Sequence, residues 1–344
     1  MSLLPAQEVI KEWKQIDCTG IELLENSLIW GLENSSNQYI NTDKTDKHML
    51  YSFTVNGNEA KIEEGLSLSY YTIDGTRRTY WLNDETLLFR YAGWQRSTYQ
   101  FSNNEVVEKV YNMNGANFDK RATGDQMFAI DNIGYEIFYD DRACIYKLDF
   151  EYAPPTGTVY YVKVADLATH APIEILTIGI LKNTVYYLSK DGFCSVEISA
   201  NAQTPAVPEL IPSVNNISGI DESILLVTDK QNRVWIMNNS AGVIEYNATT
   251  KEATKIAEFP NLSKTIDFNK VCFYSKENLY CITNQKVYSL GEPTPPTPPT
   301  PPTPPTPPTP DNPQTEDECG CLGIEFLLAL AGLFILRTIA IRNS

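Results

Sequence analysis

A run of Thr-Pro-Pro triplets between Pro293 and Pro310 limits what this chain can fold into more than any other feature. Proline fixes φ at about −65° and has no backbone N–H, so the run cannot join a helix or a sheet and favours polyproline II. At ~3.1 Å per residue it reaches roughly 55 Å. We therefore expect residues 292–318, the triplets and the acidic linker after them, to form a stalk.

An apolar segment follows the stalk from Leu322 to Ile341, with charged side chains only at Glu325 and Arg337. A helix of this length is about 30 Å long, which matches the hydrocarbon core of a bilayer. The stalk leaves this segment no neighbouring core to pack against. We expect one transmembrane helix within residues 319–344, and a helix docked on the folded domain is the alternative.

Charges on either side of this segment predict its orientation. Acidic residues precede it at Glu316–Glu318, and Arg337 and Arg342 lie in its last part and after it, so the C-terminus is expected in the cytoplasm and the domain outside. Met1–Gln15 shows no basic start, apolar core or cleavage site of a signal peptide. Either the true start lies upstream, or the domain is cytoplasmic and the tail inserts after synthesis. The arginines favour the first reading, a protein of the cell envelope displayed on the cell surface.

The segment Cys319-Gly320-Cys321, followed by the apolar run and a short end, resembles the tripartite C-terminal sorting tails of bacterial surface proteins. These tails form the CTERM class, and the Cys-containing Synerg type is the most similar. The resemblance covers residues 319–344. It implies that Gly320, Cys321 and Arg337 serve sorting or processing, and that a sorting or processing enzyme is a partner of the tail. Domains attached to such tails vary in function.

Composition limits the partners and the fold of the remaining residues. A net charge of −16 argues against nucleic acid and anionic membrane surfaces as partners of the domain. The hydrophobic fraction of 42% suffices for a sizeable core. The 20 tyrosines and the lack of long helical periodicity indicate an all-β fold.

An internal repeat gives the architecture. Each copy consists of an apolar strand, a polar turn and a short apolar run, and most copies are spaced like the four-stranded blades of a β-propeller. The copies are Ile21–Trp30, Trp81–Phe89, Met127–Phe138, Ile178–Tyr187, Ile217–Leu226 and Ile266–Tyr274. We expect a six-bladed β-propeller over residues 17–291, or seven blades if residues 1–16 or 62–75 complete another. A tandem of β-sandwiches is the competing architecture.

The fifth unit and the N-terminal segment have specific predicted boundaries. In the fifth unit, strands are expected near Ile217 and at residues 224–228, 234–237 and 255–259, with residues 242–250 as an outer connection. The segment 1–16 is set apart from the propeller, and Leu4–Trp13 within it is the one stretch that suits a short helix.

The seven cysteines include one pair that a hairpin would bring together. A two-residue turn at Lys276-Glu277 would place Cys272 directly opposite Cys281, where a disulfide could form in an exported protein. Cys-x-x-Cys spacing is absent from the sequence, and no histidine lies near the strand cysteines, so no zinc site or other cofactor is expected.

The sequence shows little that suggests catalysis. His48 and His170 are the only histidines, and both are expected in surface loops. No nucleophile elbow, P-loop, zincin helix or calcium loop occurs. Asn and Asp recur between the first two strands of the units, where we expect them to serve tight turns. These residues are Asn26, Asp84, Asn132, Asn183, Asp221 and Asn269.

Three functions remain open. We favour a non-enzymatic display module, whose loop face binds a protein, polysaccharide or peptide outside the cell and whose tail holds it to the membrane. The first alternative is an extracellular enzyme that hydrolyses or eliminates glycans through paired carboxylates, with Trp94 or Tyr70-Tyr71 stacking on sugar rings. The second alternative is a structural protein of the envelope.

Overall fold

The part of the chain that the computed structural model describes is built almost entirely of strands. The described residues are 11–25, 28–33, 38–44, 47–68, 79–91, 95–102, 105–114, 127–139, 143–167, 178–201, 204–221, 224–229, 231–258, 271–282 and 286–291. All of them belong to the unit Met1–Thr294. Within these ranges the helical elements are the short η1 (Ile21–Leu24) and α1 (Pro212–Asn215). The all-β fold class is confirmed.

The described strands form six antiparallel groups of four. The first three groups are β2 (Leu28–Glu33), β3 (Gln38–Lys44), β4 (Lys47–Asn56) and β5 (Glu59–Leu68); β6 (Thr79–Asn83), β7 (Thr86–Tyr91), β8 (Gln95–Ser102) and β9 (Glu105–Asn114); and β10 (Met127–Ile130), β11 (Ile133–Tyr139), β12 (Ala143–Glu151) and β13 (Gly157–Asp166). The last three are β14 (Ile178–Leu181), β15 (Thr184–Ser189), β16 (Gly192–Glu197) and β17 (Glu209–Leu210); β18 (Ile224–Thr228), β19 (Arg233–Asn238), β20 (Gly242–Asn247) and β21 (Glu252–Ala257); and β22 (Val271–Ser275), β23 (Asn278–Ile282), β24 (Val287–Gly291) and β1 (Glu12–Thr19).

The sixth group joins the two ends of the described chain. Strand β1 pairs antiparallel with β24, from Glu12 opposite Gly291 to Ile16 opposite Val287. Strand β1 therefore includes residues 12–16, which lie before the boundary at residue 17 expected from the sequence. The helix considered over Leu4–Trp13 lies mostly outside the described residues, and its last two residues belong to β1.

Outer strands of neighbouring groups are also joined to each other. Asp17–Thr19 of β1 run parallel to Glu59–Lys61 of β5, and Gly157–Tyr160 of β13 run parallel to Tyr111–Asn114 of β9. Ala206 forms a further parallel bridge with Ala165. These pairings extend beyond each four-stranded group, so the groups are linked by backbone hydrogen bonds as well as by packed side chains.

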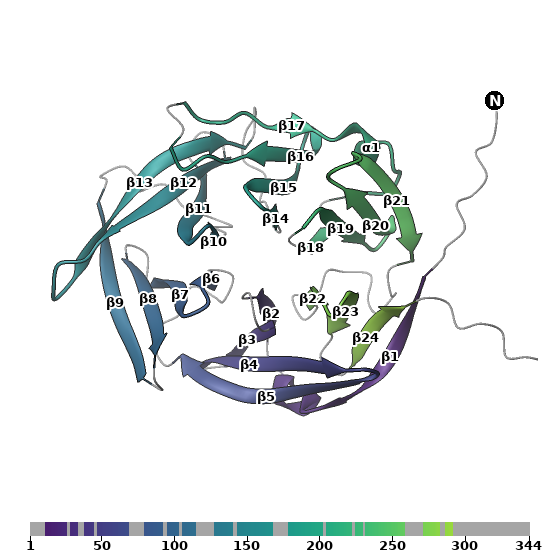
Figure 1. Ribbon diagram of the computed structural model, residues 1–344, viewed down its shortest axis with the longest axis horizontal. Coiled ribbons are helices and arrows are strands. Elements are labelled where there is room, and N and C mark those ends of the chain that lie inside the picture. Colours follow the sequence, from purple (N-terminus) through teal and green to yellow (C-terminus); the bar gives the residue numbers. More distant parts are fainter. Residues whose placement is uncertain are drawn as a thin grey trace, which may run out of the picture. The chain divides into compact units, whose positions relative to one another are not determined.

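The first strands of the groups follow one another around a common centre (Figure 1). Contacts join β2 to β6, β6 to β10, β14 to β18, β18 to β22, and β22 back to β2. The remaining step is made by a hydrophobic cluster in which Phe128 and Ile130 share a core with Ile178 and Ile180. This order is compatible with the β-propeller expected from the sequence.

The repeat is present, but for three of the six copies the strand expected to be second in its group is the first. Trp81–Phe89, Met127–Phe138 and Ile178–Tyr187 each cover the first two strands of a group, as expected. The apolar runs that end the copies at Trp30, Leu226 and Tyr274 instead belong to the first strand itself.

The fifth group shows this error most clearly. Ile217 follows α1 and lies in no strand, and residues 242–247 are strand β20 where an outer connection was expected. Ile217 has the apolar character of a strand residue because it packs on the core between the fourth and fifth groups. The connection between β20 and β21 is a tight turn instead, in which Asn247 Oδ1 accepts hydrogen bonds from the backbone N–H groups of Thr249 and Thr250.

Candidate functional site

Large apolar side chains are exposed on the outer strands of the second, third and fourth groups and in the connections beside them. On β13 the alternate residues Tyr160 and Val162 point outward, and they are 39% and 43% exposed. Alternate residues of a strand share one face, so these two side chains lie on the same surface. We call six exposed residues the outer surface, although Val107 of β9 faces the opposite side of the sheet from Tyr160, whose partner is Asn114. The six residues are Val107, Tyr152, Tyr160, Val162, Val207 and Leu210.

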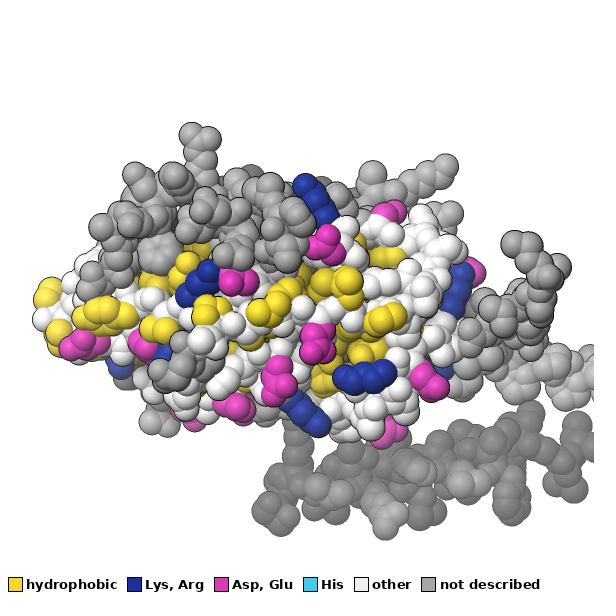
Figure 2. All heavy atoms as spheres, turned by 90° about the horizontal axis from the view of Figure 1, so that it is seen from above, with side chains coloured by type: hydrophobic (Ala, Val, Ile, Leu, Met, Phe, Trp, Pro, Cys, Tyr) yellow, Lys and Arg dark blue, Asp and Glu magenta, His cyan; other side chains and the backbone are white. Residues whose placement is uncertain are grey.

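Backbone pairing brings the strands that carry these residues together. Tyr160 lies opposite Asn114 of β9, and the residue before Val207 bridges to Ala165 near the end of β13. Figure 2 shows the side of the domain on which β13, β17 and α1 lie in Figure 1, with hydrophobic side chains distributed among acidic and basic ones. Val207 is 73% exposed and Leu210 52%, which are the largest values among the large hydrophobic residues described.

Polar groups accompany the tyrosines of the outer surface. The Tyr160 hydroxyl donates a hydrogen bond to Glu151 Oε2 at 3.2 Å. Lys109 Nζ lies 5.3 Å from the centroid of the Tyr152 ring, which is a cation–π distance. Tyr111 packs edge-on against Tyr152, with ring centroids 5.7 Å apart. Tyr152 is therefore held by its neighbours while part of its ring stays exposed.

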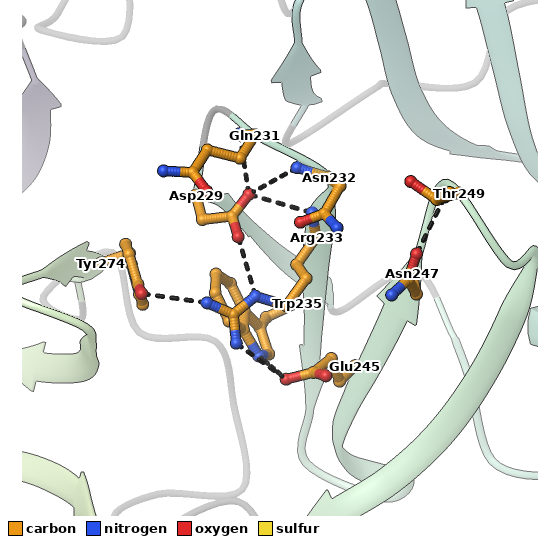
Figure 3. Close-up of polar contacts among 9 residues, drawn as sticks. All are labelled: Asp229, Gln231, Asn232, Arg233, Trp235, Glu245, Asn247, Thr249 and Tyr274. Carbon is orange, nitrogen blue, oxygen red and sulfur yellow. Dashed lines mark hydrogen bonds and ion pairs between the residues drawn. The ribbon is translucent and has the colours of Figure 1, made fainter.

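A second cluster surrounds Arg233 on β19 (Figure 3). Its guanidinium carbon lies 4.8 Å from the centroid of the Trp235 ring, and the rings of Trp235 and Tyr274 are themselves stacked at 4.8 Å. Arg233 Nη2 donates to the Tyr274 hydroxyl at 3.0 Å. Trp235 Nε1 donates to Glu245 Oε2, also at 3.0 Å. Because Tyr274 comes from β22, this cluster connects the fifth and sixth groups.

Asp229 organises the turn that begins this cluster. Its Oδ1 accepts hydrogen bonds from the backbone N–H groups of Gln231, Asn232 and Arg233, and its Oδ2 accepts one from Arg233 Nε at 2.8 Å. Burial alone would raise the pKa of Asp229, but the hydrogen bonds from the Arg233 side chain and the three backbone groups outweigh it. The pKa of Asp229 is therefore below its ordinary value.

This lowered pKa predicts a contribution to stability that depends on pH. A carboxyl with a lower pKa in the folded state stabilises the fold above its ordinary pKa, and the contribution is lost as the pH falls through the folded value. Asp229→Asn is expected to cost about 1–3 kcal/mol at neutral pH and to flatten the loss of stability below about pH 4. Urea denaturation at several pH values measures both effects.

The matched control for this prediction is Asp149→Asn, since the side chain of Asp149 is 49% exposed and pairs with Lys147 at the surface. We expect that variant to change the free energy of unfolding by less than about 1 kcal/mol. An Asp229→Asn protein with wild-type stability at neutral pH would contradict the role assigned to the turn.

The Arg233 cluster is best explained as a structural contact. The donors and acceptors of Arg233, Asp229 and Trp235 bond to one another or to neighbouring groups of the cluster, and the Asp229 side chain is 2% exposed. Two carboxylates beside one guanidinium leave the cluster with a net negative charge, which disfavours an anionic ligand. We therefore assign the cluster to holding neighbouring groups together and look for ligand binding elsewhere.

A third polar cluster is closed off from solvent. Arg96 on β8 and Glu136 on β11 form a bidentate ion pair, with Nε–Oε2 and Nη2–Oε1 distances of 2.8 and 2.6 Å. Both side chains are 0% exposed. The Tyr161 hydroxyl donates a third hydrogen bond to Glu136 at 3.3 Å. This buried ion pair connects the second and third groups.

Many of the residues predicted to be functional lie outside the described part of the chain. Gly320, Cys321 and Arg337 lie outside the described residues, as do Trp94, Tyr70, Tyr71 and His170. His48 was expected in a loop, but it lies in β4, opposite Asp43 of β3. Among the residues that the structure describes, no helix is long and apolar enough to cross a bilayer, and no group of side chains has the composition of a metal site. The expected transmembrane segment, 322–341, is outside that part of the chain.

The expected turn residues are mostly where turn chemistry requires them. Asp84, Asn132 and Asn183 lie in the tight turns between the first two strands of their groups. Asn132 has a φ of 63°, a left-handed conformation that asparagine tolerates well. Asp221 is not in such a turn, and its Oδ1 accepts a hydrogen bond from Asn238 Nδ2 at 2.8 Å. Asn26 and Asn269 lie outside the described residues.

The cysteine pair has the predicted register. The turn between β22 and β23 is Lys276-Glu277, and Cys272 lies directly opposite Cys281. The two sulfurs are not bonded to each other in this structure. For comparison, burial raises the pKa of the Cys18 and Cys144 thiols to about 11, so these two are protonated and weakly nucleophilic at neutral pH.

Comparisons with known proteins add no functional assignment. No protein-family model matches the chain. No curated protein is significantly similar to it in sequence.

Proposed function

We propose that this chain is a membrane-anchored display module, in which a six-bladed β-propeller binds a protein partner at the cell surface. The blade number is supported by the six groups of four strands and by the pairing of β1 with β24. The described parts of the two segments considered for a seventh blade belong to other groups. Residues 12–16 pair within the sixth group, and residues 62–68 belong to β5 in the first.

The observation that carries the binding role is the outer surface. Single exposed apolar residues are normal, whereas several that lie on or beside one strand are typical of an interaction site. Tyr160 and Val162 share one face of β13, and Val207 follows Ala206, which bridges to Ala165 of the same strand. Tyrosine is enriched at protein interfaces because it buries a large area while its hydroxyl keeps a hydrogen bond. Tyr152 and Tyr160 have this character, being partly exposed and supported by Lys109 and Glu151.

The aliphatic members of this surface favour a protein over a polysaccharide. The aliphatic side chains of Val162, Val207 and Leu210 are exposed to solvent. Covering them with other apolar side chains would remove this surface from water and stabilise a complex. Sugar hydroxyls would have to lose water against these side chains without gaining hydrogen bonds. A flat protein surface with apolar side chains at its centre is the partner that fits these residues best.

Anchoring is supported by the sequence at the end of the chain. The Thr-Pro-Pro run begins two residues after the end of β24, the last strand described, so a stiff spacer would join the propeller to the apolar segment 322–341. A spacer of roughly 55 Å would hold a small domain away from the membrane and leave its outer strands accessible to large partners.

Photocrosslinking on intact host cells tests this function. We expect a photoreactive phenylalanine derivative at position 160 or 207 to form a covalent adduct with a protein, because both positions lie on the outer surface. The same probe at Lys61 of β5 should form none, since that exposed side chain lies outside the outer surface. Protease added to the intact cells should remove the adduct if the domain is external.

A second variant checks that the adduct depends on the surface itself. With the probe at position 207, Tyr160→Ala should lower the adduct yield severalfold, since a partly buried interface tyrosine often contributes more than about 1 kcal/mol to binding. Equal adduct yields at positions 160 and 61 would contradict the proposal. Adducts that contain polysaccharide and no protein would assign the surface to the other ligand class.

A further inference from the structure

The hairpin between β22 and β23 has a fixed geometry at its turn. Lys276 and Glu277 both have positive φ, 45° and 64°, and only these two residues separate Ser275 from Asn278. Two consecutive left-handed residues in a two-residue loop make a type I′ turn, which matches the twist of the strands beside it. The register of the strand pair is therefore set by the turn.

This register decides which kind of pair the two cysteines form. The residues beside a two-residue turn, Ser275 and Asn278, exchange backbone hydrogen bonds, and the pair type alternates along an antiparallel ladder. Counting from the turn, Cys272 and Cys281 form a non-hydrogen-bonded pair. In such pairs the Cα atoms are about 4.5 Å apart, which lies within the range that a disulfide spans.

The two thiols differ in their access to solvent. Both face the apolar layer between the fifth and sixth groups, together with Trp235 and Leu279. Cys281 is 0% exposed, whereas Cys272 is partly exposed at the edge of this layer. A small oxidant would therefore reach Cys272 first.

We propose that Cys272 and Cys281 form a reversible disulfide across this hairpin by exchange with a low-molecular-weight disulfide such as oxidised glutathione. The Cys272 thiolate attacks the sulfur–sulfur bond of the oxidant, forms a mixed disulfide and releases one thiol. The Cys281 sulfur then attacks the Cys272 sulfur and releases the second thiol. The two cysteine protons leave with the released thiols, so the oxidant is reduced as the pair is oxidised.

The disulfide would act on the contact between the fifth and sixth groups. Cys272 is two residues from Tyr274 on the same face of β22, and Tyr274 stacks on Trp235 and accepts a hydrogen bond from Arg233. Closing the pair would fix β22 to β23 at this point and hold Tyr274 in place against the neighbouring group.

Peptide mapping of the full chain can detect this disulfide, because trypsin cleaves after Lys276 and places the two cysteines in different peptides. The reduced protein is incubated with glutathione disulfide, its remaining thiols are alkylated, and it is digested with trypsin without reduction. The proposal predicts a disulfide that links the peptides 271–276 and 277–286. Failure to find this linked pair in the folded protein, under conditions in which a denatured sample forms it, would overturn the proposal.

Two single-cysteine substitutions test whether Cys272 is the attacking thiol and Cys281 the resolving thiol. Cys281→Ala should retain glutathione on Cys272, because the resolving thiol is gone. Cys272→Ala should leave Cys281 unmodified in the folded protein, and Cys144 and Cys194, both buried, serve as internal controls. An adduct on Cys281 in the Cys272→Ala protein would refute the assignment of Cys272 as the attacking thiol. Circular dichroism verifies that each variant is folded.

Discussion

Replacing Glu136 with Gln is expected to lower the free energy of unfolding by about 3–5 kcal/mol. The substitution keeps the size of the side chain but removes the carboxylate charge that faces the buried Arg96 guanidinium. Bulk water cannot solvate the guanidinium in place of the carboxylate, because both side chains are 0% exposed. Urea denaturation followed by tryptophan fluorescence measures the change.

Two controls separate loss of the charge partner from a general intolerance of this position. The double variant Arg96→Met with Glu136→Leu removes both charges and should recover most of the lost stability, since apolar residues often replace a buried ion pair without net cost. Glu63→Gln breaks the exposed pair with Lys61 and should change the stability by less than about 1 kcal/mol. If the double variant were as unstable as Glu136→Gln, the charge argument would be wrong.

The second large effect is expected at Gly20, between β1 and η1. Gly20 has a φ of 81°, and a Cβ placed there would lie 2.0 Å from the backbone oxygen of Ile62. Gly20→Ala therefore combines the left-handed penalty of about 1–2 kcal/mol with an overpacking cost of about 1–3 kcal/mol. The backbone of β5 has to move before the methyl group fits.

Gly57 provides a matched control for this substitution. It also has a positive φ, 62°, but apart from its chain neighbours no described residue has an atom within 4 Å of the position that a methyl group would take there. Gly57→Ala should cost only the conformational penalty of about 1–2 kcal/mol. Thermal and urea denaturation of both variants give the difference, and equal losses of stability at the two glycines would show that the contact with Ile62 has no energetic weight.

The all-β class and several hairpins could be predicted because local signals agree there. In Met127–Phe138 two apolar strands flank Asp131-Asn132, whose positive φ values suit the turn chemistry of these residue types. The Cys272–Cys281 register followed from the spacing of a two-residue turn, and local geometry fixed it. Predictions of this kind depend on residues close together in sequence.

The errors in strand register have a physical origin. An apolar run of three or four residues is the same signal in a first strand, a second strand or a core-facing connection. Ile217 was assigned to a strand because it is apolar and followed by a polar turn, yet it packs on the core directly after α1. Residues 242–250 were expected to form a connection, whereas residues 242–247 are strand β20.

The polar clusters could not be predicted, because their members are distant in sequence. The strand Gln95–Ser102 is rich in polar residues and is typical of an exposed strand, but Arg96 is fully buried. Its partner Glu136 is 40 residues away and comes from another group. Tyr274 is likewise 41 residues from Arg233. Only the assembly of neighbouring groups brings these side chains together.

The outer surface was also missed, since Tyr160 and Val162 alternate with more buried residues as in any amphipathic strand. What distinguishes them is that their outward side is left uncovered although their strand pairs on both edges, with β12 and with β9. Sequence periodicity shows that a strand has two faces, but it does not show which neighbours cover each of them.

The pairing of β1 with β24 has a mechanical consequence for a tethered domain. Tension on the Thr-Pro-Pro run would enter the fold at Gly291, at the end of β24. That strand is bonded to β23 on one side and to β1 on the other. Pulling along β24 would have to shear two ladders at once, so the domain can bear load through its last strand without unravelling from its edge.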